Sequence, residues 1–221
     1  MRSKWLSRKV FVFFILLTAL FSLVACGKKE QGKQPNFPVT EYVSSSELFN
    51  LYIPTGWSSE EVMPGADLVM ANTEAALERN YSDGTIESGD LVLNIGFLPV
   101  AFFREKELSH LEIQIEASPD AFLQSLLPMF HVEGDPTGNV AGQAALVSLG
   151  DGRDAGRLTF SKDGYEGLIL VFKAGKDVFA IVSAVTYPGG LRELQETIYD
   201  VAAGVAYDGS QNALYSKLYG D

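Results

Sequence analysis

The sequence is poor in the residues from which disulfides and metal sites are made. Among 221 residues Cys26 is the only cysteine, which excludes a disulfide within the chain and a cysteine-based metal cluster. The two histidines, His110 and His131, lie in different segments, and a catalytic zinc usually needs about three protein ligands. We therefore predict no metal and no cofactor, and we interpret both histidines as ordinary surface or core residues.

Recognisable catalytic motifs are also missing. The chain has no Gly-x-Ser-x-Gly elbow and no phosphate-binding loop, and the turn Asp151–Asp154 lacks the spacing of a calcium-binding EF-hand. Glu60-Glu61, Glu105 and Glu107 are interpreted as solvated loop charges. Paired carboxylates that meet only in three dimensions stay open from sequence. With no motif to carry a reaction, we predict that the protein is not an enzyme.

Basic residues are scarce outside the N-terminus. Four of the 17 (Arg2, Lys4, Arg8 and Lys9) lie within residues 1–25, whereas all 28 acidic residues follow. If residues 1–25 are removed, 13 basic and 28 acidic residues remain, and the formal charge changes from −11 to −15. Nucleic-acid binding depends on Lys and Arg that neutralise phosphates, so we predict no nucleic-acid partner. The acidity fits solubility through self-repulsion, or else a preference for cations or a basic partner.

No apolar run reaches the roughly 20 residues that a membrane-spanning helix needs. The longest run, Val10–Ala25, has 16 residues and is interrupted only by Thr18 and Ser22. Residues 1–9 carry four positive charges and no negative one. A charged region followed by an apolar run of this length is typical of a secretory signal peptide. We predict that residues 1–25 direct export and are then removed.

The apolar run ends in Leu23-Val24-Ala25-Cys26. This segment resembles the lipobox of bacterial lipoproteins, with an aliphatic residue at −3, a small residue at −1 and cysteine at +1. The resemblance implies diacylglycerol on the thiol of Cys26, cleavage between Ala25 and Cys26, and anchoring by acyl chains such as palmitate. Cysteine suits this chemistry because a thiolate is the better nucleophile toward the lipid donor. The alternative interpretation is an uncleaved signal anchor with an incidental cysteine.

Residues 26–40 are interpreted as a flexible tether, because Gly27–Pro35 is polar, contains Gly and Pro, and has no periodicity. Its lysines would lie beside the lipid head groups. Gly27 follows the predicted lipidated cysteine. An aspartate at this position would resemble a signal for retention in the inner membrane, so glycine favours the outer membrane in a two-membrane bacterium. In a one-membrane organism the chain would lie on the outer face of the plasma membrane. We predict an extracytoplasmic, lipid-anchored protein.

Apolar periodicity and turn residues predict the elements in the first half of the domain. The expected strands are 48–53, 67–71 and 90–98, and the expected helices are 73–79 and 119–127. Asn72 or Thr73 would cap the first helix, and Ser118 followed by Pro119 would begin the second. Residues 111–116 alternate between apolar and polar, which predicts a half-exposed strand or an extended loop.

The second half is typical of an antiparallel meander. Four strand-like runs are separated by short turns: 142–149, 155–162, 165–173 and 178–186. Two turns contain Asp-Gly, at 151–152 and 163–164, which is the strongest short-range signal for a hairpin. A C-terminal helix follows, with one apolar face formed by Leu191, Leu194, Ile198, Val201 and Val205. Residues 207–221 are expected to be a loose tail.

The strand that ends in Pro54-Thr55-Gly56-Trp57, the meander and the closing helix resemble the PsbP-like domain. That fold is shared by photosystem II extrinsic proteins, a nuclear Ran-release factor and many bacterial lipoproteins. The resemblance implies an α+β fold, an α/β/α sandwich in which helices flank both faces of an antiparallel sheet of about six strands. The domain would span residues 41–206. No partner-binding or metal-binding residue can be transferred, and a shared fold does not determine function.

Aromatic residues offer a last clue, although base rates favour core packing over a ligand pocket. They are Trp57, Phe97, Phe102, Phe103, Phe122 and Phe130. Two functions stay open. The first is a monomeric, membrane-anchored accessory module that docks on an envelope protein, and it predicts a filled core with an exposed patch. The second is a carrier of a small molecule or metal ion, and it predicts a large enclosed cavity among the phenylalanines.

Overall fold

The computed structural model describes residues 32–105, 108, 111–130, 142–162, 164–209, 213–214 and 218. These residues form ten strands, three α-helices and two 3₁₀ turns. The elements follow one another as β1 (Val39–Val43), β2 (Phe49–Pro54), β3 (Ser58–Met63), β4 (Asp67–Ala71), α2 (Glu74–Ser82), β5 (Leu91–Pro99), η1 (Phe102–Arg104), α3 (Pro119–Leu126), η3 (Leu127–Phe130), β6 (Ala145–Ser148), β7 (Asp154–Lys162), β8 (Tyr165–Gly175), β9 (Val178–Thr186), α4 (Leu191–Gly204) and β10 (Ala206–Tyr207).

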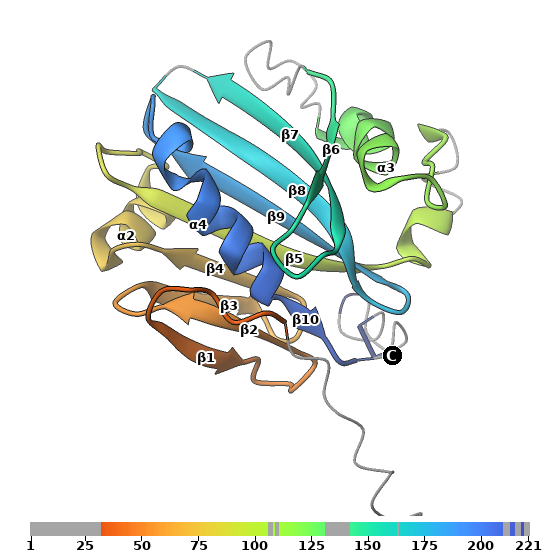
Figure 1. Ribbon diagram of the computed structural model, residues 1–221, viewed down its shortest axis with the longest axis horizontal. Coiled ribbons are helices and arrows are strands. Elements are labelled where there is room, and N and C mark those ends of the chain that lie inside the picture. Colours follow the sequence, from red (N-terminus) through yellow and green to blue (C-terminus); the bar gives the residue numbers. More distant parts are fainter. Residues whose placement is uncertain are drawn as a thin grey trace, which may run out of the picture. The chain divides into compact units, whose positions relative to one another are not determined.

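A seven-stranded antiparallel sheet is the centre of the fold, with strand order β3-β4-β5-β9-β8-β7-β6 (Figure 1). A second sheet has three strands in the order β1-β2-β10. The α+β class and the antiparallel sheet predicted from sequence are confirmed. The strand count is higher than expected because β1, β3 and β10 had no sequence signal of their own.

The C-terminal meander is confirmed by three hairpins, which join β6 to β7, β7 to β8 and β8 to β9. Gly152 and Gly164 have φ angles of 89° and 88°. Residues that carry a side chain rarely adopt this left-handed backbone conformation, so each Asp-Gly pair supplies the glycine that its tight turn needs.

Helices cover both faces of the large sheet, as predicted. On one face, α4 crosses the strands and the small sheet packs beside it (Figure 1), and both bury apolar side chains against β4, β5, β8 and β9. On the other face, α2 packs on Val69, Ala71 and Val92, whereas α3 packs on β7, β8 and β9. The two helices therefore cover opposite ends of this second face.

The first helix is held by a cap and by a buried ion pair. Ala76 N donates to Thr73 Oγ1 over 3.0 Å, which confirms one of the two predicted N-caps. At the other end Arg79 Nη2 donates to both carboxylate oxygens of Asp90, at 2.8 and 2.6 Å. Asp90 is 5% exposed and also accepts from Glu87 N over 2.8 Å. This pair connects α2 to the start of β5.

At both ends the packed chain extends beyond the predicted bounds of 41–206. Lys33 N donates to Ala203 O over 3.0 Å, and β1 already begins at Val39. At the other end Tyr207 is 2% exposed in β10, and Leu214 is fully buried in the main core. Between these ends, residues 112–114 form neither a helix nor a strand and Glu112 has a φ of 50°, which excludes the strand interpretation of 111–116 and leaves a loop.

None of the helices in the described part of the chain combines the length and the apolar character that crossing a membrane requires.

Gly156 allows α3 to approach the sheet closely, which gives a first prediction. A Cβ at this position would lie 2.2 Å from Pro119 O, a backbone atom that cannot move aside alone. We expect Gly156→Ala to lower the free energy of unfolding by about 1–3 kcal/mol, the usual cost of overpacking. Gly96→Ala is the matched control, because nothing lies within 4 Å of its Cβ. Thermal unfolding of both variants tests this, and equal melting temperatures would contradict it.

Candidate functional site

The segment after the predicted lipidation site is docked on the domain at the end of α4. Lys33 is held there twice, since its backbone N donates to Ala203 O over 3.0 Å and its Nζ donates to Gly150 O over 2.8 Å. A Cβ at Gly32 would lie 2.1 Å from Gly204 O, so only glycine permits this approach. Pro35 is buried. We call residues Gly32–Pro35 the docked segment.

Several residues singled out from sequence lie outside the described part of the chain. These are Cys26 with the cleavage position after Ala25, both histidines (His110 and His131), and Glu107. The lipid attachment stays a prediction. Among the residues that are described, no group of three or more His, Cys, Asp or Glu is arranged to hold a metal ion.

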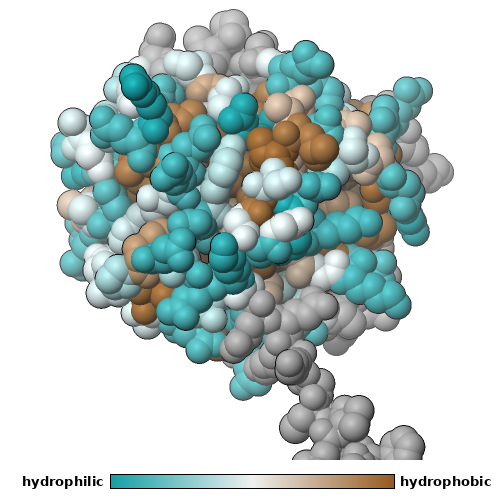
Figure 2. Space-filling view, viewed as in Figure 1, coloured by the Kyte–Doolittle hydropathy of each residue, from teal (hydrophilic) through white to brown (hydrophobic). Residues whose placement is uncertain are grey.

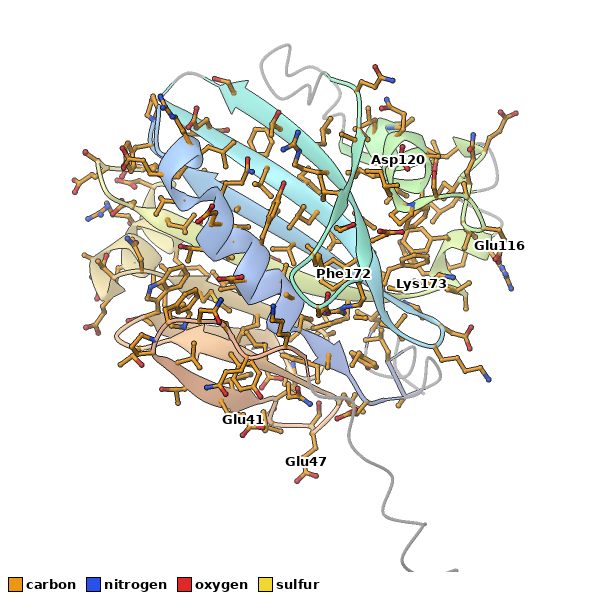
Figure 3. The ribbon with its side chains drawn as sticks, in the orientation of Figure 1. Glu41, Glu47, Glu116, Asp120, Phe172 and Lys173 are labelled. Atoms are coloured by element: carbon orange, nitrogen blue, oxygen red, sulfur yellow. The ribbon has the colours of Figure 1, made fainter. Side chains whose placement is uncertain are left out.

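The acidic turn Asp151–Asp154 has a structural role in the described fold. Asp151 forms an ion pair with Arg153, whose Nη2 donates to Ala202 O and Ala203 O over 3.3 and 3.1 Å. The guanidinium also lies 4.7 Å from the ring centroid of Phe172, which Figure 3 labels. Arg153 thus satisfies carbonyl groups at the C-terminus of α4, and Asp151 orients Arg153.

The interpretation of Glu61 as a solvated loop charge is wrong. Glu61 lies in β3 and accepts hydrogen bonds from Gly65 N, Ser45 N and Tyr42 Oη over 2.7, 2.9 and 3.3 Å. Burial raises its pKa, but the backbone donors outweigh burial and hold the pKa below its usual value. Burial and the charge of Glu61 raise the pKa of Tyr42 to about 12. Glu61 therefore stabilises the two loops that contain Ser45 and Gly65, a role that no sequence motif predicts.

Most of the aromatic residues singled out from sequence pack in the core, although Phe97 also lines the groove described below and Phe122 lines a second cavity. Phe97 packs in the main core, whereas Phe103 and Phe122 stack with Phe179 beneath α3, with ring centroids 4.3 to 5.9 Å apart. Phe102 and Trp57 are partly buried against these clusters. The side chain of Phe130 lies outside the described residues.

A groove lies on the second face, over β4, β5 and β9 between the parts of the sheet that α2 and α3 cover, and Leu218 near the C-terminus also lines it. Its volume is about 340 Å³, and its lining includes Met63, Asp67, Asn94, Leu98, Ile181 and Ser183. Strand pairing places these side chains together, because Asp67 is opposite Gly96, Gly96 in turn is opposite Ile181, and Asn94 is opposite Ser183. Gly96 has no atom within 4 Å of its Cβ position, so the floor is open there.

Asp67 is the charged group of this groove. The residue is half-buried, and burial raises the pKa of its carboxyl group, although hydrogen bonds from Leu68 N and from the Asn94 side chain lower it. Its Oδ1 is buried and has no hydrogen-bond partner among the described residues. A carboxylate oxygen without a donor is costly to keep in a protein, so a donor that arrives from outside would be stabilised here.

No family model and no curated protein matches this chain. Among solved structures, a protein of Bacteroides thetaiotaomicron is 15% identical, with a TM-score of 0.43, and the match covers 77% of this chain. The match covers 48% of that protein, so the chain spans about half its length. The cyanobacterial PsbP of Synechocystis is 14% identical, with a TM-score of 0.43, over 80% of this chain and 98% of that one.

Two further structures are similar over most of their length. A mutant of the protein Mog1 is 12% identical with a TM-score of 0.39, over 82% of this chain and 92% of that one. LpqN of Mycobacterium tuberculosis, described as involved in cell envelope biogenesis, is 13% identical with a TM-score of 0.33, over 79% and 93%. The family that the sequence resembles, PsbP, is thus among the structures similar to this chain. At these scores the similarities carry no conclusion about function.

Proposed function

We propose that the chain is an extracytoplasmic lipoprotein, anchored through Cys26, whose domain serves as a non-catalytic accessory module for a protein of the cell envelope. The observation that carries this proposal is the order of the N-terminal segments. A signal-like run ends in Leu23-Val24-Ala25-Cys26, and the chain is docked on the domain only seven residues later, at Lys33.

This short connection would keep the domain close to the lipid. Seven residues span at most about 25 Å, since an extended chain advances roughly 3.3–3.6 Å per residue. The end of the domain that carries the C-terminus of α4 and Gly150 would then lie within that distance of the acyl chains. The docked segment therefore supports a module held at the membrane with one end facing it.

Exposed apolar side chains on an edge strand support the docking of a protein. Val62 is 52% and Met63 is 39% exposed, and both lie on β3, the edge of the large sheet. Edge strands offer unpaired backbone groups, and apolar patches beside them mark sites of protein interaction. On the face drawn in Figure 2, hydrophobic residues occur in several separate groups among polar ones.

The test is a pull-down of the lipidated protein from native membranes in mild detergent. We expect an envelope protein to be retained, and the double variant Val62→Ser/Met63→Ser to retain at least fivefold less of it. Leu146→Ser is the matched control, because Leu146 is 50% exposed on β6 at the opposite edge. A pull-down that retains no envelope protein would contradict the accessory role, and equal retention by both variants would exclude β3 as the surface.

A further inference from the structure

The groove between α2 and α3 has the size and the composition of a small ligand site. Ligand pockets have volumes of roughly 300–1,000 Å³, are mostly apolar, and carry a few polar groups that orient the ligand. The groove, at about 340 Å³, offers Leu98, Ile181 and Met63 as apolar walls. Its polar groups are Asp67, Asn94 and Ser183, which are brought together from three strands.

The charge of this groove is negative and has no counterpart among its described lining residues. Asp67 lines it, and the lining residues that the structure describes include no lysine, arginine or histidine. A second cavity of about 310 Å³, beside the start of α3, is different, because Asp154 lines it together with Arg153 and Lys173. The carboxylate of that second cavity is accompanied by basic side chains, whereas the described lining of the groove offers Asp67 none.

The hydroxyl group of Tyr81 lies in the same negative potential. Tyr81, on α2, is 51% exposed, and its pKa is raised by partial burial and by the charges of Glu60 and Asp67. Glu60 and Asp67 therefore act together on the side of the groove next to α2. Because opposite charges attract most strongly where water is partly excluded, a cation would be favoured at Asp67 over bulk solvent.

We infer that the groove binds a small organic cation, a primary ammonium group carried on an apolar body. The ammonium group donates to the Asp67 carboxylate and to the side-chain oxygens of Asn94 and Ser183. The apolar body lies over Gly96, where the floor is open, and against Leu98 and Ile181. The ligand supplies the positive charge that the described lining lacks and a donor for Asp67 Oδ1, and it buries its own apolar surface.

The probe that tests this inference is 2-phenylethylamine, compared with its neutral isostere 2-phenylethanol. Both are titrated into the full processed protein while the backbone amide signals of residues 94–98 and 181–183 are followed by NMR. We expect both sets of signals to shift and the amine to bind at least tenfold more tightly than the alcohol. Equal affinities, or shifts elsewhere in the domain only, would overturn the inference.

Three variants assign the effect to the groove. Asp67→Asn keeps the shape of the groove and should make the affinities for the amine and the alcohol about equal. Gly96→Leu should fill the floor of the groove and weaken the binding of both probes at least tenfold. Glu196→Gln is the control, because it removes an exposed carboxylate from α4 on the opposite face. An amine preference that survives Asp67→Asn would overturn the inference, as would calcium ions alone producing the same shifts and displacing the amine.

Discussion

Replacing Asp90 with alanine is expected to lower the free energy of unfolding by about 3 kcal/mol, because a buried carboxylate loses its hydrogen bonds and Glu87 N is left without its acceptor, even though Arg79 keeps its ion pair with Glu87. Asp90 is 5% exposed and accepts three hydrogen bonds through its carboxylate, two from Arg79 Nη2 and one from Glu87 N. For a domain of this size the melting temperature should fall by roughly 6–12 °C. Calorimetry or thermal circular dichroism measures the change.

The control for Asp90 is an ion pair of similar length at the surface. Arg104 Nη2 lies 3.0 Å from Glu116 Oε1, but their side chains are 62% and 79% exposed, and Figure 3 shows Glu116 at the edge of the molecule. Exposed pairs contribute about 0–1 kcal/mol, so Glu116→Ala should hardly change the melting temperature. If the two variants were equally stable, the connection between α2 and β5 would not depend on Asp90.

The contrast between these two pairs illustrates what the sequence could and could not predict. The meander was predictable because its turns are formed by residues adjacent in sequence, and Asp-Gly at 151–152 directly indicates a hairpin turn. Asp90 and Arg79 are also close in sequence, yet nothing in their spacing says that β5 and α2 bury them together. Burial of a polar residue depends on how the elements pack, and the periodicity of a single segment does not predict that packing.

The missed strands have a related explanation. The six residues of β3, Ser58–Met63, are exposed or only half-buried, so they show no apolar alternation from which to predict a strand. β10 has only two residues and exists because Ala206 pairs with Asn50, far away in the chain. Both strands are produced by partners that the local sequence does not contain.

The candidate groove was likewise beyond sequence reasoning. Asp67, Asn94 and Ser183 come from three strands that are adjacent only in the folded sheet. Of the phenylalanines that the sequence offered as walls of a pocket, Phe97, Phe103 and Phe122 lie in the core, and Phe97 also lines the groove. The predicted anchor is the opposite case, because processing enzymes would recognise Leu23-Val24-Ala25-Cys26 as a linear segment that needs no folded context.

Replacing Cys26 with serine is therefore expected to have the largest effect of all, the complete loss of lipid from the protein. Serine cannot receive the diacylglycerol thioether, and each buried methylene of an acyl chain contributes about 0.8 kcal/mol to membrane binding. One chain gives only marginal binding, whereas two or three give a stable anchor. The variant should lack the acyl mass and should keep residues 1–25, because the dedicated peptidase acts after lipidation.

An uncut signal could itself hold the variant at the membrane, so a second protein separates the two causes. In it, residues 1–25 are replaced by a general secretory signal that is cut independently of lipid, and Cys26→Ser is retained. We expect this chain in the aqueous fraction, whereas a Ser22→Ala protein, which keeps its own signal and Cys26, should stay with the membrane. If Cys26→Ser left the mass and the processing unchanged, the anchor would be wrong, and the docked segment at Lys33 would no longer place the domain beside a bilayer.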